Sequence, residues 1–417
     1  MKKHDRAGDL RRKIAKCVVG YLVLLPMLAL GWLYSSLPDH VYLEPGQTLS
    51  LARFAYLEPL GARGSQNVAS TRAVGSYQTT LSLGGWLPIK TVRTIVTDRA
   101  QVTVCGTPFG VKMFSEGALI VGFSDVERPD GGTGNPAKEA GLHLGDRVIR
   151  IGTTETESND AVKEALEAAE GEAVEVVYIR HEEQFCTTLT PVWDASADQW
   201  RAGMWVRDSS AGVGTLTFAE EEQGVFAGLG HPISDSDTGE SIALRSGEIV
   251  PCEITGCSKG TAGSPGELKG RFLSGQAIGS IRINGENGVY GTTRTTFQGA
   301  KMEVAFSQEI ETGDAVILST TSGETPRAYQ VRIERINDAD ARRNMVVRVT
   351  DPELLAQTGG IVQGMSGSPI LQNGRLVGAV THVLVNDPTR GYGIFAQTML
   401  EQTEKVSQMA QNQKMAK

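Results

Sequence analysis

An uncharged apolar run from Cys17 to Tyr34 constrains this chain more than any other stretch of its sequence. Seven Lys or Arg against two Asp precede the run within residues 1–16, and no Lys or Arg occurs in the eighteen residues after it. The run is longer than the core of a secretory signal peptide, which spans about 7–15 residues, and nothing resembling A-x-A follows it. We therefore expect a retained membrane helix at residues 17–35, with a buried core helix as the alternative. The basic flank predicts that residues 1–16 are cytoplasmic and that the chain after about residue 36 is outside.

Glycine and turn residues predict a mainly β fold for the exported part. The chain has 49 Gly, its short apolar runs are broken by Gly, Pro, Asn or Asp, and helical patterns are few. A length of 417 residues predicts two or three domains, at roughly 150 residues each. The formal charge of -8 gives no basic footprint for nucleic acid, so that class of partner is excluded.

The cysteines argue against a metal site. Five of them are scattered without C-x-x-C spacing or interleaved histidines: Cys17, Cys105, Cys186, Cys252 and Cys257. We expect neither zinc nor any other metal or cofactor. Cys252 and Cys257 are close enough in sequence to form a disulfide outside the cytoplasm, and two unpaired buried thiols are the alternative.

The exported part divides into three regions and a tail. Residues 36–107 consist of short strands and loops and form a β-rich connecting region. Residues 108–193 combine strands with helical segments, and residues 194–403 return to strands and turns. Residues 404–417 are polar, which predicts a frayed helix or disorder after Gln402.

Residues 108–193 contain a recognisable string, P-A-K-E-A-G-L-H-L-G-D-R-V-I-R-I. A helix is predicted from about Asp160 to Glu170, with Asn159 as its cap and Gly171 as its stop. This order resembles a PDZ domain of the bacterial protease-associated type.

The PDZ resemblance implies that an extended peptide is bound by strand addition, with backbone amides of an apolar loop receiving its terminal carboxylate. By position that loop is Phe109, Gly110 and Val111. The alternative is that these three residues begin a buried strand.

Residues 194–403 show the period-two alternation of strands. It is clearest where Tyr329, Val331 and Ile333 alternate with polar residues. Strands and turns over this length predict a β-barrel or a pair of barrels.

The run G-I-V-Q-G-M-S-G-S-P-I, which begins at Gly360, carries the chemistry. Gly364 and Gly367 flank Ser366, and tight glycine turns let a serine project its Oγ into a site. The backbone amides of Gly364 and Ser366 would then form the oxyanion hole. Chymotrypsin-like peptidases place the G-x-S-G string at the nucleophile, and Ser368 in the fifth position excludes the G-x-S-x-G elbow of α/β-hydrolases. Ser264, in A-G-S-P, is expected to be an ordinary turn serine.

A general base must accompany this serine. His231 occupies a glycine-rich turn upstream of Ser366, reading G-L-G-H-P, and a neutral imidazole can take the serine proton. A surface histidine without function is the alternative. His382 lies on an apolar strand and is expected to be a packed core residue, although it is the alternative base.

Asp351 ends a strand just before Pro352, a suitable place for the acid of a triad. The order His231, Asp351, Ser366 matches chymotrypsin-like enzymes and differs from subtilisins and α/β-hydrolases. Asp351 lies only 15 residues before Ser366, closer than in the digestive enzymes. Asp235, Asp237 and Asp387 are the alternative acids.

Together these motifs resemble the stage IV sporulation protein B peptidases of endospore-forming bacteria. The strings that carry the resemblance are G-H-P at 230–232, V-T-D at 349–351, the run 358–369, G-A-V-T-H-V at 378–383 and N-D-P at 386–388. The resemblance implies a triad of His231, Asp351 and Ser366.

It further implies a serine endopeptidase that acts between the forespore and mother-cell membranes. Such an enzyme cuts itself and a regulator of a membrane metalloprotease, which activates a late sigma factor. A PDZ-bearing signalling scaffold with an inactive peptidase domain is the rival hypothesis. A secreted esterase is a third, which the anchor and the motif order disfavour.

Overall fold

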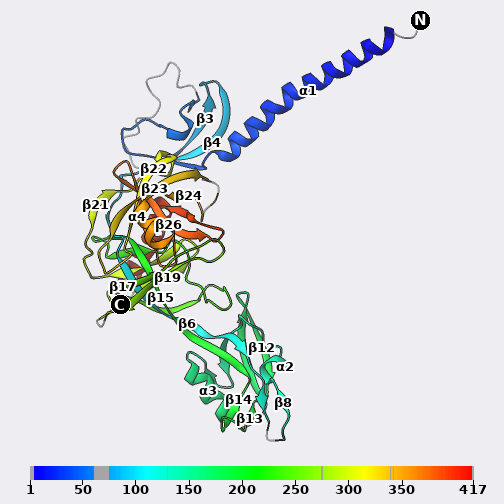
Figure 1. The fold of residues 1–417 in the computed structure, drawn as a ribbon, viewed down its shortest axis with the longest axis vertical. Coiled ribbons are helices and arrows are strands. Elements are labelled where there is room, and N and C mark those ends of the chain that lie inside the picture. Colours follow the sequence, from blue (N-terminus) through cyan, green and yellow to red (C-terminus); the bar gives the residue numbers. More distant parts are fainter. Residues whose placement is uncertain are drawn as a thin grey trace.

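The computed structural model describes residues 4–60, 75–128, 130–273, 276–338, 340 and 342–415. Its first element is α1 (His4–Ser36), a single helix that extends away from the rest of the molecule (Figure 1). Within α1, the stretch Ile14–Ser36 is long and apolar enough to cross a bilayer. The apolar helix predicted near the N-terminus is therefore present.

A four-stranded sheet follows α1 directly. Its strand order is β1 (His40–Leu43), β4 (Leu87–Val96), β3 (Gly75–Leu83) and β2 (Leu57–Pro59), with β1 parallel to β4. The short helix η1 (Ala52–Phe54) precedes β2. Leu33, in the last turn of α1, and Leu37, just after it, are buried in the core of this sheet with Leu81 and Val92. Helix and sheet therefore form one packed unit.

Six strands close a first barrel. They pair in the order β6 (Pro108–Phe123), β17 (Leu244–Ser258), β19 (Gly279–Gly285), β20 (Gly288–Thr293), β16 (Val225–Gly228) and β15 (Met204–Glu220), and β15 returns to β6. Phe109, Phe226 and Val289 are buried together in its core. Three further strands flank it: β5 (Gln101–Val104), β18 (Glu267–Phe272) and β21 (Ala300–Glu303).

The second barrel is closed in the order β22 (Gly313–Ser319), β23 (Arg327–Ile336), β24 (Met345–Val349), β27 (Asp387–Phe395), β26 (Arg375–Leu384) and β25 (Pro369–Gln372). The short helix η2 (Ser307–Glu309) precedes it, and α4 (Pro352–Thr358) lies between β24 and β25. Tyr329, Val331 and Ile333 all point into its core, as their alternation predicted. The mainly β fold with a β-barrel is confirmed.

The chain ends in α5 (Ala396–Met415), a longer and more regular helix than predicted. Met399, Thr403 and Val406 recur at helical spacing and are buried. α5 packs against β16, β20 and β26, so this face is covered by the barrels. Tertiary packing thus orders a segment whose polar composition predicted fraying or disorder.

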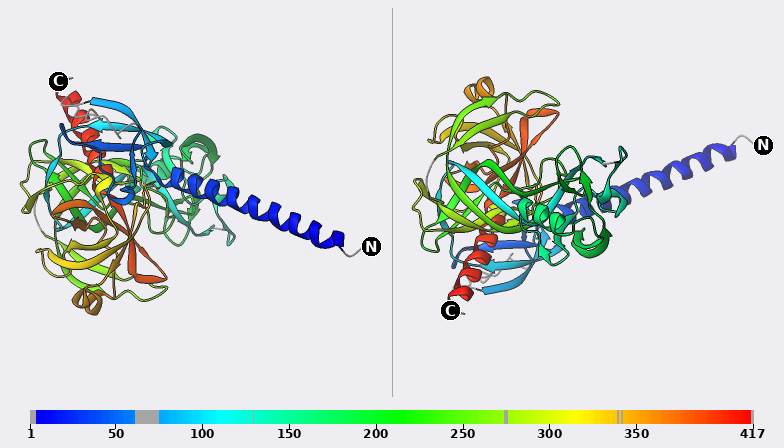
Figure 2. Two further views of the ribbon diagram at one scale, coloured as in Figure 1. Left: turned by 90° about the horizontal axis from the view of Figure 1, so that it is seen from above. Right: turned by 90° about the horizontal axis from the view of Figure 1, so that it is seen from below.

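The far halves of β6 and β15 enter a separate lobe, at the opposite end of the molecule from α1 (Figure 1). Seen along the long axis, the lobe and α1 project to the same side of the barrels (Figure 2). Its other elements are β7 (Val126–Glu127), β8 (Thr133–Gly134), α2 (Pro136–Glu139), β9 (Arg147–Ile151), β10 (Thr154–Glu155), α3 (Asn159–Ala168), β11 (Val174–Arg180), β12 (Glu183–Leu189), β13 (Val192–Asp194) and β14 (Gln199–Arg201). Ile120, Val148 and Leu166 belong to a core of its own. The cap of α3 is Ser158, whose Oγ accepts from Ala161 N, and not Asn159.

Phe109, Gly110 and Val111 lie inside β6 and not in a loop. Gly110 pairs with Val213 of β15 on one side and with Val250 of β17 on the other. Both edges of this backbone are therefore occupied, and the predicted role of the three residues in binding a carboxylate is wrong. The alternative, a buried strand, is correct. The PDZ assignment of the lobe stays a prediction, and the lobe shares β6 and β15 with the barrel, so no boundary falls at residue 108.

The two nearby cysteines are not joined. Cys252 and Cys257 both lie on β17, and both are free thiols. Burial raises the pKa of Cys252 to about 11, so this thiol is unreactive at neutral pH.

Candidate active site

A cleft of about 740 Å³ lies between the two barrels. The first barrel contributes Val213 and His231, and the second contributes Ser366, Thr381 and His382. The structure thus brings the predicted nucleophile, the predicted base and the alternative base to one cavity. No Asp or Glu is among the described residues that line it.

Ser366 lies in a loop, residues 359–368, that joins α4 to β25; we call it the serine loop. Its backbone is tied to both barrels, since Gly367 N donates to Val380 O at 2.7 Å and Thr215 N donates to Ser366 O at 2.9 Å. Gly367 has φ +94°, and a Cβ at this position would lie 1.9 Å from Thr215 O. Only glycine fits, which explains the G-x-S-G string in terms of close packing between the barrels.

The hydroxyl of Ser366 donates to the carbonyl oxygen of Thr381 at 2.5 Å. The neighbouring Ser368 is fully buried and bonds to Ser319 at 3.0 Å, so it does not face the cleft. Ser264 occupies an exposed turn that closes through its backbone onto Thr261, as expected of a turn serine. Among the three serines, Ser366 alone lines the cleft.

The predicted oxyanion donors are the backbone amides of Gly364 and Ser366. Within the described part of the chain neither amide donates a hydrogen bond, whereas Met365 N between them donates to Val362 O. Two unused amides around the nucleophile have the chemistry an oxyanion hole needs. Their catalytic role stays a prediction.

His231 follows β16 through a tight turn in which Leu229 and Gly230 both have positive φ. Its Nδ1 lies 2.7 Å from the carbonyl oxygen of Pro232. A carbonyl only accepts, so Nδ1 carries the proton and Nε2 is left with its lone pair. Burial lowers the pKa of His231, which keeps the ring neutral near pH 7. This is the tautomer and charge that a general base requires.

His382 faces the cleft beside His231, with ring centroids 4.5 Å apart and planes tilted by 36°. Its side chain is exposed, so the expectation of a packed core residue is wrong. The pairing of β25 with β26 ends at Ala379, and beyond it the strand borders the cleft. Although the residue is exposed overall, its ring is partly desolvated where it faces the cleft, and this desolvation, the charge of a protonated His231, and Arg343 lower the pKa of His382 to about 4.

Side chains hold the segment that carries His231, residues 229–243, which we call the histidine loop. The buried carboxylate of Asp235 accepts from Thr238 N at 3.0 Å and from Arg207, which extends from β15. Burial alone would raise the pKa of Asp235, but these hydrogen bonds hold it below its usual value. Asn284 bonds to both strands of the loop through the backbone of Ile233 and Ile242.

Asp351 lies elsewhere. Its carboxylate caps α4 by accepting from Glu353 N and Leu354 N at 3.0 Å each, and from Gln330 N at 3.2 Å. It does not line the cleft and has no contact with His231 in the structure. The predicted grouping of all three triad residues is therefore absent from this conformation, and the catalytic role of Asp351 stays a prediction.

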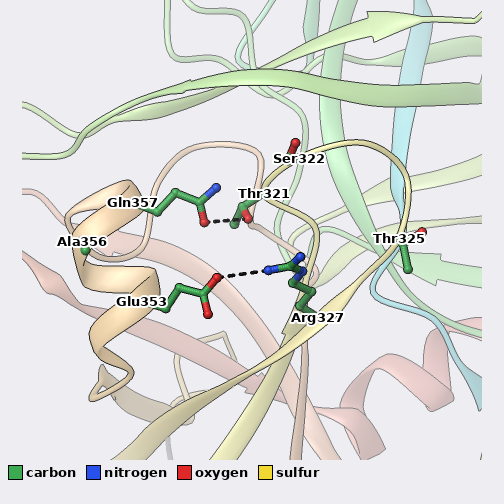
Figure 3. A pocket seen from close by; sticks show the side chains of 7 residues that line it. All are labelled: Thr321, Ser322, Thr325, Arg327, Glu353, Ala356 and Gln357. Carbon is green, nitrogen blue, oxygen red and sulfur yellow. Dashed lines mark hydrogen bonds and ion pairs between the residues drawn. The ribbon is translucent and has the colours of Figure 1, made fainter.

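Side-chain hydrogen bonds also hold α4, the helix that Asp351 caps, on the face that lines a second pocket. Figure 3 shows Gln357 and Glu353 of α4 pointing toward Thr321 and Arg327 across a separate pocket of about 570 Å³. The two hydrogen bonds measure 2.9 and 3.1 Å. Bringing Asp351 to His231 would require movement of α4 or of the histidine loop.

The alternative acids have other partners. Asp235 and Asp237 both pair with Arg207, and Asp387 accepts from Thr389 and Arg390. None of the three contacts the His231 ring in the described structure. No group of three or more potential metal ligands occurs among the described residues.

Arg207, Asn284 and Thr381 were missed by sequence reasoning. Thr381 Oγ1 is buried beside Ser366 and has no hydrogen-bond partner among the described residues. An unmatched buried hydroxyl costs about 1–3 kcal/mol, so it marks a place where a further polar group is expected. For Thr381, the only signal in the sequence was its position next to His382.

Comparison with known proteins identifies a peptidase family. Residues 198–400 match the family model of the SpoIVB peptidase S55. A crystal structure titled Rv3671c protease, inactive form, is 14% identical, covers 46% of this chain and 84% of that one, and has a TM-score of 0.28. No curated protein is a match in sequence.

Proposed function

Because residues 198–400 make this chain a serine peptidase of the SpoIVB peptidase S55 type, we propose that it is a membrane-anchored endopeptidase acting outside the cytoplasm. Ser366 is the nucleophile and His231 the general base. The observation that carries this assignment is the cleft that contains both residues, with Nδ1 of His231 bonded to a carbonyl so that Nε2 is free.

In the reaction, Oγ of Ser366 attacks the carbonyl carbon of the scissile peptide bond while Nε2 of His231 takes its proton. The amides of Gly364 and Ser366 stabilise the oxyanion. The imidazolium then protonates the leaving amine, and a water activated by the same histidine hydrolyses the acyl-enzyme.

The described arrangement is a resting one. The hydroxyl of Ser366 is bonded to Thr381 O and must leave it before the proton can pass to His231. Asp351, the acid implied by the resemblance, caps α4 instead of contacting the imidazole. A rearrangement that brought this carboxylate into the cleft would place a charged partner beside the forming imidazolium.

The substrate and location follow from the resemblance to the stage IV sporulation protein B peptidases. The substrates are the chain itself and a regulator of a membrane metalloprotease, whose release activates a late sigma factor during endospore formation. The helix Ile14–Ser36 anchors the enzyme, with the basic residues before it in the cytoplasm. The exported part lies in the space between forespore and mother-cell membranes.

A scaffold with an inactive peptidase domain is the rival function, and the bond from Ser366 to Thr381 O favours it, since a serine held this way is not activated. Purified full-length chain in detergent separates the two. We expect new termini, mapped by mass spectrometry, that are absent from Ser366→Ala and unchanged in Ser264→Ala. Identical termini in wild type and Ser366→Ala would support the scaffold.

A further inference from the structure

Two aromatic side chains are exposed at one edge of the N-terminal sheet. Trp86, in the turn between β3 and β4, is 73% exposed, and Tyr56, just before β2, is 50% exposed. Leu57 pairs with Leu83, which places Tyr56 opposite the turn that contains Trp86. We call Tyr56 and Trp86 the aromatic edge. Two large rings left open to water at one place indicate a binding surface.

The aromatic edge lies on the side of the sheet from which α1 arrives. β1 and β4 are parallel, with His40 opposite Arg93. α1 ends at Ser36, four positions before His40, and Trp86 precedes Arg93 by seven positions. At about 3.3 Å per residue in a strand, the turn reaches back at least to the level of the last turns of α1. Figure 1 shows β3 and β4 beside this end of the helix.

Lys90 of β4 connects the N-terminal sheet to the end of α1. Its Nζ donates to Leu37 O at 2.6 Å, forms an ion pair with Asp39 at 2.9 Å and lies 5.2 Å from the ring centroid of Tyr34. Leu33 and Leu37 are buried in the sheet core, so no flexible linker separates sheet and helix. The sheet is therefore held against the end of the apolar stretch.

The same end of α1 carries its own exposed aromatics. Trp32 is 68% exposed and Tyr34 is 54% exposed. Tryptophan and tyrosine concentrate at membrane interfaces, where the ring lies among the headgroups and its polar atom stays hydrated. Trp32 and Tyr34 thus mark the outer boundary of the bilayer.

We propose that the aromatic edge inserts into the interfacial region of the same bilayer that α1 crosses. This insertion rests on the proposed membrane anchor and gives the protein a second contact with the bilayer. The second contact fixes the orientation of the N-terminal sheet, and hence of the barrels packed on it, relative to the membrane. The contact is apolar, because both side chains of the aromatic edge are uncharged, and Lys90 beside it is already paired with Asp39. Its partner is a lipid surface of any headgroup charge.

Tryptophan quenching in nanodiscs made with brominated phospholipids tests this. Full-length chain is compared with Trp32→Phe, Trp86→Phe and Trp205→Phe, and each difference spectrum gives the emission of one tryptophan. Trp205 is the matched control, since it is 62% exposed but lies on β15 in the distant lobe. We expect the lipid to quench more than half of the Trp32 and Trp86 emission, to leave Trp205 unaffected, and to do so equally at low and high salt.

Quenching of Trp32 without quenching of Trp86 would overturn the proposal and leave the anchor intact. Failure to quench Trp32 would overturn the anchor, and the proposal with it. Shielding of Trp86 from iodide without quenching by lipid would assign the aromatic edge to a protein partner instead.

Discussion

The serine loop and the histidine loop supply the two halves of one site, yet they are held in different ways. The serine loop is fixed by main-chain hydrogen bonds between the barrels and by glycines that let the chains approach, and the hydroxyls of Thr215 and Thr217 add two hydrogen bonds to its carbonyls. The histidine loop is fixed by side chains from elsewhere, namely Arg207 of β15 and Asn284 of β19. Both loops contact β15: the serine loop at Thr215, inside the barrel, and the histidine loop through Asp235 at Arg207, where the strand enters the separate lobe.

Replacing Asp351 tests whether a third segment, besides the serine loop and the histidine loop, takes part in catalysis. Of the replacements that leave the nucleophile and the base in place, it should lower activity the most. Asp351→Asn should retain the cap of α4, because Asn caps helices as well as Asp does. Its NH2 group cannot accept from Gln330 N, so stability should fall by only about 1 kcal/mol. Peptide hydrolysis should fall by up to about 10⁴-fold if the carboxylate stabilises the imidazolium. The measurements are kcat/KM on a short peptide and thermal unfolding, with Glu353→Gln on the same helix as control. Near-normal kcat/KM would show that Asp351 does not act on His231, and that the carbonyl oxygen of Pro232 orients the imidazole instead.

Gly367→Ala tests the main-chain attachment of the serine loop. A side chain at positive φ costs roughly 1–3 kcal/mol, and the new Cβ would also collide with Thr215 O. The loop must shift, and a displacement of about 1 Å can lower turnover about 10²-fold. Gly374→Ala is the control, because its φ is +76° but no atom lies within 4 Å of a Cβ. Equal losses in the two variants would show that strain, and not the contact between barrels, matters.

Asp235→Asn tests the side-chain attachment of the histidine loop. Loss of a charge-assisted hydrogen bond of this kind removes about 1.5–3 kcal/mol, and we expect roughly a 10-fold fall in kcat with little change in KM. Asp237→Asn is the matched control, since Asp237 pairs with the same arginine but is half exposed. A change confined to KM would mean that Arg207 and Asp235 act on substrate binding and not on His231.

The pH dependence of stability should show the smallest effect. His382 has a folded pKa of about 4, below its ordinary value near 6.5. Below pH 6.5 the unfolded chain gains this proton before the folded one does, so the free energy of unfolding should fall between about pH 6.5 and 4. His382→Gln should flatten that decline in chemical denaturation experiments. An unchanged slope would show that the His382 ring is not desolvated in the cleft in solution.

The two loops also explain how much of the site the sequence could predict. The glycines that shape the serine loop are adjacent to Ser366 in the chain, so the string around Ser366 predicted which serine faces the cleft, although its main-chain partners Thr215 and Val380 are remote in sequence. The partners of the histidine loop are remote in sequence, and no local pattern links Arg207 or Asn284 to His231. His382 and Phe109 were misjudged because apolar neighbours do not reveal where strand pairing ends or which edges are already occupied. The mainly β fold was predictable, whereas the sharing of β6 and β15 between barrel and lobe depends on long-range pairing.

The most direct test of the account is labelling of the full-length chain with a fluorophosphonate, which reacts quickly only with an activated serine. The account predicts one modified peptide, containing Ser366. Labelling should vanish in Ser366→Ala, fall sharply in His231→Ala and stay unchanged in Ser264→Ala. Modification that persists in Ser366→Ala, or that proceeds at the wild-type rate without His231, would contradict the assignment of nucleophile and base to this cleft.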